Sequence, residues 1–529
     1  MQEYDSVHDE PVALGLLDWN GRTVRRNWIQ WAAIGVAAVA LLLAVGWASN
    51  GALSRFARDR AMSGLRKSFA SDLQVKSLEV SVFPRLRITG EGIVLHYKGR
   101  HDLPPLISIR KLTGESGLAS VLMGHVQQVR LEGLEIEIPP RSGALRGKKS
   151  TSSRIAGFVI DEVIADGAVL QTIPGKPGKA PLEFQIRKLT LHGAGPHSSM
   201  TFRATLENPE PPGEIESTGD FGPWQAEEPA ETPVEGKYTF RNANLSVFPG
   251  ICGTLSSEGS YRGVLEQIQV EGTTDTPDFA LKVGGNKLDL KTRFQAVVDG
   301  TDGDTQLNAV HAELGHTPVE AKGSVAGGKG VQGKTVSLDV SVENGRLADL
   351  LRLAVKGPAA MSGAIGFRAR LVVPPGPQDI AERVRLDGEF SADSAVFRKL
   401  NVQEKVNKLS HGGKGEPEES PADTVGSDFS GRFHVANGVA ALENLSFRVP
   451  GVSITLNGTY GLMDERLDFH GAARMEAKLS QATTGIKSLL LKVVDPIFDK
   501  KGKGAVVPLR ITGTAQKPSF GLDVGAKAK

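Results

Sequence analysis

Apolar side chains recur at every second position through much of this chain, and no other feature constrains its fold as strongly. The same spacing appears in residues 288–298, 336–342 and 452–456. Because successive side chains of a strand point to opposite faces, each such segment is predicted to be a strand with one apolar face. The first of these segments carries its apolar side chains at Leu78, Val80, Val82, Leu86 and Ile88.

Glycine-containing turn signals separate the alternating segments. Such pairs typically join neighbouring antiparallel strands. The chain has 62 glycines and 29 prolines among 529 residues, which is rich in turn formers but below the level of a disordered chain. The sequence therefore predicts a mostly β protein built from antiparallel meanders. The turn signals are Asp299-Gly300, Asp302-Gly303, Glu343-Asn344-Gly345, Asn437-Gly438 and Asn457-Gly458.

Charge and cysteine content exclude several classes of protein. The chain has 62 basic and 60 acidic residues. It therefore lacks the excess of Lys and Arg needed to neutralise nucleic acid phosphates, and no nucleic acid partner is expected. Cys252 is the only cysteine, which excludes an intramolecular disulfide and any metal site built on several cysteines.

Residues 28–48 form an apolar run that only Gln30 interrupts. As a helix this run would be about 31 Å long, which matches the core of a bilayer. Trp28, Trp31 and Trp47 lie near its ends, where indole rings favour the membrane interface. We therefore predict a transmembrane anchor, with residues 1–27 in the cytoplasm. The alternative is a cleaved signal peptide, against which the length of the run argues.

Helices are expected to be few. Apolar residues at helical spacing predict short helices at 346–355, 380–384 and 402–409, and an amphipathic helix near 480–494. Glycine, proline and charge predict surface loops at 141–153, 207–235 and 410–427. The exported part is divided accordingly into a β region over 49–140, a central β region over 155–400, a flexible loop over 401–428 and a C-terminal β region over 429–529.

The motifs that could support catalysis are weak. Residues 328–335 fit the pattern of a phosphate-binding loop, but period-two alternation follows directly, so a strand rather than a helix is expected behind it. His311 and His316 are five residues apart, whereas a metalloprotease helix requires a spacing of four. We therefore expect no enzyme activity, no catalytic residues, no metal and no cofactor. The lysine of the loop-like motif, Lys334, is expected in a hairpin.

An anchor followed by glycine-rich strands with one apolar face resembles the AsmA-like family of bacterial envelope proteins, which are related in architecture to bridge-like lipid-transfer proteins. The likeness extends over most of the chain and consists of patterns of alternation and glycine turns. It is carried by Ser81–Leu86, Gly117–Gly124, Val129–Ile136, Ser430–Phe433, Gly458–Gly461 and Leu509–Thr514.

The resemblance implies an elongated, twisted antiparallel sheet folded into an open apolar groove. It implies that the groove holds or conducts phospholipids between the inner and outer membranes, with the chain spanning the inner membrane once and its large C-terminal region in the periplasm. Outer-membrane or periplasmic proteins are further expected partners. The residues expected to line the groove are Leu78, Val80, Val82, Leu288, Leu290 and Phe294.

Two alternatives remain open at the level of sequence. Alternation is equally compatible with a closed sandwich, in which two halves of the sheet pack together without room for a ligand. A second function is that of an envelope scaffold or chaperone, which would assist outer-membrane protein assembly through exposed strand edges. With roughly one strand per 14 residues, about 30 strands would extend over roughly 150 Å.

Overall fold

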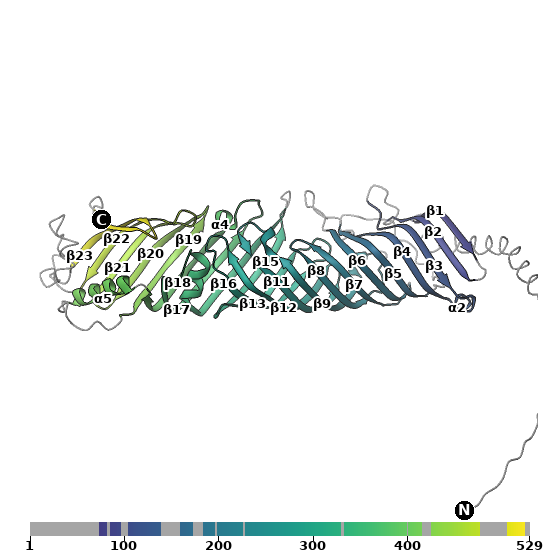
Figure 1. Ribbon diagram of the computed structural model, residues 1–529, viewed down its shortest axis with the longest axis horizontal. Helices are drawn as coiled ribbons and strands as arrows, with labels where there is room; N and C mark the ends of the chain where they lie inside the picture. Colours follow the sequence, from purple (N-terminus) through teal and green to yellow (C-terminus); the bar gives the residue numbers. More distant parts are fainter. Residues whose placement is uncertain are drawn as a thin grey trace, which may run out of the picture.

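The computed structural model describes residues 73–81, 85–96, 104–138, 159–172, 183–195, 198–225, 228–328, 333–398, 400–414, 425–476 and 505–523. Over these ranges the chain forms one sheet of 24 strands, curled into an open half-barrel with few helices (Figure 1). The mostly β fold predicted from the alternation is confirmed.

The strands, in chain order, are β1 (Leu73–Ser81), β2 (Leu86–Leu95), β3 (Ile107–Ser116), β4 (His125–Ile138), β5 (Val159–Thr172), β6 (Glu183–Ala194), β7 (Met200–Pro209), β8 (Pro212–Phe221), β9 (Pro233–Asn244), β10 (Ile251–Cys252), β11 (Thr254–Val264) and β12 (Gln267–Leu281). They continue with β13 (Leu288–Val298), β14 (Thr305–Leu314), β15 (Thr317–Gly327), β16 (Lys334–Arg346), β17 (Met361–Val373), β18 (Arg385–Phe397), β19 (Ser427–Ala436), β20 (Val439–Val449), β21 (Val452–Gly461), β22 (Arg466–Met475), β23 (Ala505–Thr514) and β24 (Pro518–Leu522). The helices are α2 (Leu118–Leu122), α3 (Leu347–Ala354), α4 (Ile380–Arg383) and α5 (Leu400–Lys414), with 3-10 turns η4 (Pro229–Glu231) and η5 (Leu245–Val247).

The strands follow one another across the sheet in chain order, and nearly all neighbours are antiparallel. The exception to antiparallel pairing is β4 with β5, which run parallel. The exception to chain order is the two-residue strand β10, which pairs with β12 while β9 pairs with β11. The pairing of β4 with β5 and of β18 with β19 carries the sheet across the division expected between 140 and 155 and across the segment 401–428.

Several predicted segments lie outside the described residues. They are the cytoplasmic tail 1–27, the anchor 28–48 with Trp28, Trp31 and Trp47, the loop 141–153, and the amphipathic helix near 480–494. Within the ranges that the structure does describe, no helix has both the length and the apolar character needed to cross a bilayer.

Three of the predicted turns formed: Asp299-Gly300 and Asp302-Gly303 lie between β13 and β14, and Asn437-Gly438 lies between β19 and β20. Asn437 and Gly438 have φ of 52° and 74° and join β19 to β20, as expected for a two-residue hairpin. The prediction at Asn457-Gly458 was wrong, because Gly458 lies inside β21, where a Cβ would be 2.7 Å from Cδ1 of Phe469. The prediction at 343–345 was also wrong, because these residues form an irregularity within β16.

Two segments predicted as loops contain regular structure. The acidic, proline-rich stretch 207–235 includes β8, which pairs along its length with β7 and β9. Its proline content concealed the alternation that runs through the strand. The segment 401–428 begins with α5, in which Val406 and Leu409 pack onto the sheet. The helix extends beyond the one expected there, and Ser410 in the extension is 1% exposed and donates to the carbonyl of Pro450 at 2.7 Å.

One face of the sheet is apolar across the ladder, and we call it the inner face. Residues directly opposite each other on paired strands share a face. Across β16 to β19 this places Leu338, Leu371, Leu386 and Val435 together. Side chains of this face are mostly buried or partly buried, whereas those of the outer face are mostly exposed. This difference is expected for the concave and convex faces of a curled sheet.

The outer face carries rows of alternating charge. Asp339, Arg370, Asp387 and His434 lie opposite one another in turn from β16 to β19. Opposite charges on facing positions favour this register, and a slip of one residue would move them to the apolar face. The two faces therefore fix the register together. A second row consists of Arg368, Glu389, Arg432 and Glu443.

Fully buried apolar side chains form separate clusters on the inner face. Helix α3 contributes Leu347, which packs with Ile365, Ala392 and Ala395. Helix α5 contributes Val406 to a cluster on β20 to β22. The helices thus cover parts of the inner face and leave other parts to the sheet alone. A further cluster on β4 to β7 consists of Leu134, Ala165, Ala168, Ile186, Leu189 and Ala204.

Candidate functional site

The inner face is the candidate functional site, and its first strand carries two of the predicted groove residues. Leu78 and Val80 are each 8% exposed and lie opposite Gly90 and Ile88 of β2. They form a small cluster with Leu86. Val82 lies outside the described residues. This end of the inner face is closely packed.

The other predicted groove residues lie on the inner face of β13. Leu288 is buried, while Leu290 and Phe294 are partly buried. Phe294 lies opposite Val310 of β14. The described strands form a single sheet, so no second sheet covers these side chains as it would in a sandwich. The candidates on β1 and β13 share one face but belong to different stretches of it, because the strands between them separate the two groups.

Aromatic rings lie directly against glycines on the inner face. A Cβ added to Gly259 would be 2.9 Å from Cε1 of Tyr238. A Cβ added to Gly388 would be 2.7 Å from Cζ of Phe433. Glycine on the concave side also permits strong curvature, because it removes side chains that would collide as the sheet curls.

Hydroxyl side chains interrupt the apolar character of the inner face on strands β8 to β13. The oxygens of Ser217 and Tyr261 are 2.7 Å apart, and those of Tyr238 and Ser257 are 3.1 Å apart. The Oγ1 atoms of Thr274 and Thr292 are also 2.7 Å apart. The inner face is therefore apolar on both sides of a narrow polar band. We call this band the hydroxyl belt: Ser217, Tyr238, Ser257, Tyr261, Thr274 and Thr292.

The backbone determines which hydroxyls of the belt donate. Ser217 donates to the carbonyl of Lys237 (3.0 Å), so the hydrogen between Ser217 and Tyr261 comes from the phenol. Ser257 likewise donates to the carbonyl of Thr273 (2.9 Å), so Tyr238 donates to Ser257. Each phenol hydrogen is thus used inside the belt, and the phenol oxygens retain lone pairs that can accept from a ligand.

Burial raises the pKa of both Tyr238 and Tyr261, and this effect exceeds the opposing effect of their hydrogen bonds to Ser257 and Ser217. Loss of hydration is the cause, because it disfavours the phenolate. Both phenols are therefore neutral at physiological pH. The belt presents uncharged polar atoms to whatever occupies the inner face.

A hollow of about 710 Å³ lies on the outer face, between β14 and β19. Its walls are the charged rows, including Lys322, Asp339, Arg370 and Asp387. Acidic and basic groups alternate across it, so the hollow has no excess charge that would favour an anion or a cation. Its composition is opposite to that expected of a site for acyl chains, and the inner face remains the candidate.

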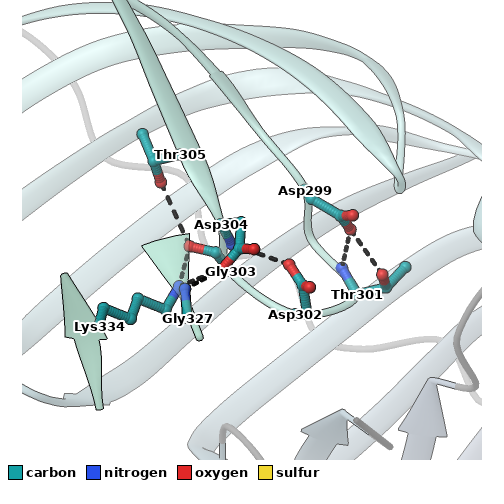
Figure 2. A network of polar contacts seen from close by, with 8 residues as sticks. All are labelled: Asp299, Thr301, Asp302, Gly303, Asp304, Thr305, Gly327 and Lys334. Atoms are coloured by element: carbon teal, nitrogen blue, oxygen red, sulfur yellow. Dashed lines mark hydrogen bonds and ion pairs between the residues drawn. The ribbon is translucent and has the colours of Figure 1, made fainter. Parts of the chain in front are cut away.

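The motif that resembles a phosphate-binding loop leads into a strand, as the alternation predicted. Lys334 is the first residue of β16 and donates to the carbonyl of Gly303, with its Nζ 3.8 Å from Oδ1 of Asp304 (Figure 2). Asp304 also accepts from the amide of Gly327 at 2.9 Å. The lysine therefore holds the β13–β14 turn against the β15–β16 turn, and no helix begins behind it to bind phosphate.

The histidines weighed as metal ligands have other contacts. His311 faces Glu320 across β14 and β15, with Nδ1 2.6 Å from Oε2. The backbone amide of His316 donates to Asp349 at 3.0 Å. Within the part of the chain that the structure describes, no three His, Cys, Asp or Glu side chains are grouped as metal ligands would be.

No family model, no curated protein and no solved structure matches this chain. The resemblance to the AsmA-like family stays a prediction. The hydroxyl belt was not identified from the sequence, although Ser257, Gly259 and Tyr261 at every second position of one strand were a signal for it.

Proposed function

We propose that this chain is anchored in the bacterial inner membrane and holds or conducts phospholipids toward the outer membrane along the inner face of its sheet, thereby supporting outer-membrane biogenesis. The observation that supports this proposal is the inner face, which follows the ladder from β1 to β24, is apolar on both sides of the hydroxyl belt and faces away from rows of charge. The proposal includes no catalytic step and no cofactor.

The energetics of acyl chains suit such a surface. Burial of a methylene is worth about 0.8 kcal/mol, so a chain of roughly 15 methylenes gains about 12 kcal/mol when it is fully buried and less in an open groove. The charged head group stays in water at the open side, because its burial without partners is costly. Where neighbouring strands present similar apolar side chains, outside the hydroxyl belt and the parts covered by α3 and α5, an acyl chain can move from strand to strand and keep most of its burial.

The length of the sheet agrees with a role between two membranes. The described residues form 24 strands rather than the 30 expected. At about 4.8 Å per strand they extend over roughly 110 Å, less than the roughly 150 Å expected from sequence.

Lipid that co-purifies with the full-length chain tests the proposal. Mass spectrometry is expected to find phospholipid in the parent and much less in a variant with Leu290→Glu and Phe294→Glu. Val297→Glu is the matched control, because Val297 lies on the outer face of the same strand, opposite Gln269 and Gln306. A folded parent without lipid, or equal loss in the control, would contradict the proposal. A stoichiometric protein in place of lipid would favour the envelope scaffold or chaperone.

A further inference from the structure

The ends of the strands form the two long edges of the sheet, and a backbone hydrogen bond joins these two edges. We call them the α3 edge, where β9 and β16 end, and the α4 edge, where β17 ends. Residues 245–252 extend from the α3 edge after β9, and residues 374–384 extend from the α4 edge after β17. The amide of Ile380 donates to the carbonyl of Pro249 at 3.0 Å. Segments about 130 positions apart in the sequence are thus in direct contact, and we call their junction the clasp.

Glycine allows the close approach at the clasp. A Cβ at Gly250 would lie 2.5 Å from Oδ1 of Asp379 and 2.5 Å from Cγ2 of Ile380. Gly250 also has a φ of 95°, which few other residues adopt. Glycine is therefore the only residue type that fits at position 250.

The clasp closes a ring of seven strands. Strand β10 pairs with β12, and from β12 the ladder runs through β13, β14, β15 and β16 to β17. From β17 the chain continues to Ile380, whose hydrogen bond to Pro249 returns to β10. A barrel of about eight strands has an interior just wide enough for side chains or one small ligand. The predicted groove residues Leu290 and Phe294 belong to this ring.

Each arm of the clasp also has hydrogen bonds that do not involve the other arm. In the first arm, Gly250 accepts from the amide of Lys282 at 2.9 Å and Phe248 donates to Leu245 at 3.0 Å. In the second arm, Asp379 accepts from the amide of Ala381 at 2.9 Å. Parting of the arms at the clasp leaves these bonds intact. The ring can therefore open there without unfolding either edge.

We propose that the clasp is a gate, which closes the central inner face into a ring and opens to admit the acyl chains of a phospholipid from the side. This inference rests on the proposed function. The gate divides the open side of the half-barrel. An acyl chain therefore reaches the inner face of β13 either from the side, through the open clasp, or from one end of the ring.

A reversible lock tests the gate in the full-length chain. Pro249→Cys and Ile380→Cys place thiols on the two residues joined by the backbone hydrogen bond, for oxidation to a disulfide, and Cys252→Ser prevents mispairing. Uptake of a fluorescent phospholipid from phosphatidylethanolamine and phosphatidylglycerol vesicles is expected to be largely lost on oxidation and restored by reductant. Equal uptake in the oxidised and reduced protein would overturn the gate while leaving the proposed function intact.

A wedge variant gives an independent result. Gly250→Val is expected to hold the clasp open and to speed uptake relative to the parent. Gly357→Val is the matched control, because Gly357 has a similar φ of 85° but no atoms within 4 Å of an added Cβ. Identical uptake in the two variants would overturn the gate.

Hydrogen exchange at the Ile380 amide measures opening without lipid. The amide is expected to exchange faster than the ladder amides of β13 to β17. Exchange as slow as that of the ladder would overturn the gate. Fast exchange in a protein that takes up no lipid would instead contradict the proposed function.

Discussion

The phenol oxygen of Tyr261 lies 2.7 Å from Oγ of Ser217, although strand β9 runs between their two strands. The ring crosses β9 above Gly236, where an added Cβ would be 2.7 Å from the phenol oxygen. A glycine on the middle strand therefore allows two hydroxyls on non-adjacent strands to pair. This contact links three strands of the hydroxyl belt.

Removal of the Tyr261 hydroxyl is expected to weaken the sheet modestly. Tyr261→Phe should lower the free energy of unfolding by about 1 kcal/mol, because Ser217 keeps its bond to Lys237 and no donor is left unpaired. In a double-mutant cycle with Ser217→Ala, urea unfolding should give a coupling energy of roughly 0.5 kcal/mol or more. Strict additivity of the two changes would show that the contact contributes nothing.

The free energy of unfolding is expected to fall in alkaline solution, partly because of Tyr238 and Tyr261 in the hydroxyl belt. Burial raises the pKa of Tyr238 and Tyr261 above the value of about 10 of a phenol in the unfolded chain. The folded state then holds protons that the unfolded state releases, so this stability is complete below pH of about 10 and is lost as pH rises through the folded pKa.

Urea denaturation at several pH values measures this loss. The variant with Tyr238→Phe and Tyr261→Phe should show a shallower decline above pH of about 10 than the parent. Parallel declines in the two proteins would show that these phenols do not contribute to the alkaline transition.

Asp349 is expected to hold α3 at its edge of the sheet. Its carboxylate is 6% exposed and accepts from the amide of His316 at 3.0 Å and from Oγ1 of Thr317 at 3.2 Å. Asp349→Ala removes the acceptor of the His316 amide and of the buried Thr317 hydroxyl, and should cost about 1–3 kcal/mol in thermal or urea unfolding. Asp349→Asn retains an acceptor oxygen and should lose less. Equal loss in both variants would argue against these hydrogen bonds.

Lys334 is expected to act in stability and not in nucleotide binding. Lys334→Ala removes the contact to the carbonyl of Gly303 and should lower the free energy of unfolding by about 1 kcal/mol. Calorimetry with ATP and Mg²⁺ is expected to show no binding in the parent or the variant. ATP binding that the substitution abolished would restore the phosphate-binding interpretation of the motif.

The sequence predicted individual strands better than the turns and contacts between them. Even-numbered apolar positions in 288–298 correctly gave β13 and its inner face, because period-two alternation is a local signal. Asn437-Gly438 gave its hairpin for the same reason. Asn457-Gly458 did not form a turn. Gly458 instead lies beneath the ring of Phe469, and this contact exists only when β21 pairs with β22, so the local sequence does not reveal it.

Long-range features were beyond sequence patterns. The contact of Pro249 with Ile380 depends on how far the sheet curls, which accumulates over many strands and is not encoded in any short segment. The pairing of Tyr261 with Ser217 likewise requires the register of three strands. Alternation alone also left the choice between a sandwich and an open groove undecided, and the single curled sheet resolves it.

Photo-crosslinking in living cells tests the central claim, that lipid lies along the inner face, most directly. A photoreactive amino acid would replace Leu206, Leu338 or Leu442, which lie on the inner face of β7, β16 and β20. The neighbours Thr205, Ser337 and Ala441, on the outer face of the same strands, serve as matched controls. Phospholipid adducts at all three inner positions and at none of the controls are predicted. Equal labelling of both faces, or the absence of adducts at the inner positions, would contradict the account.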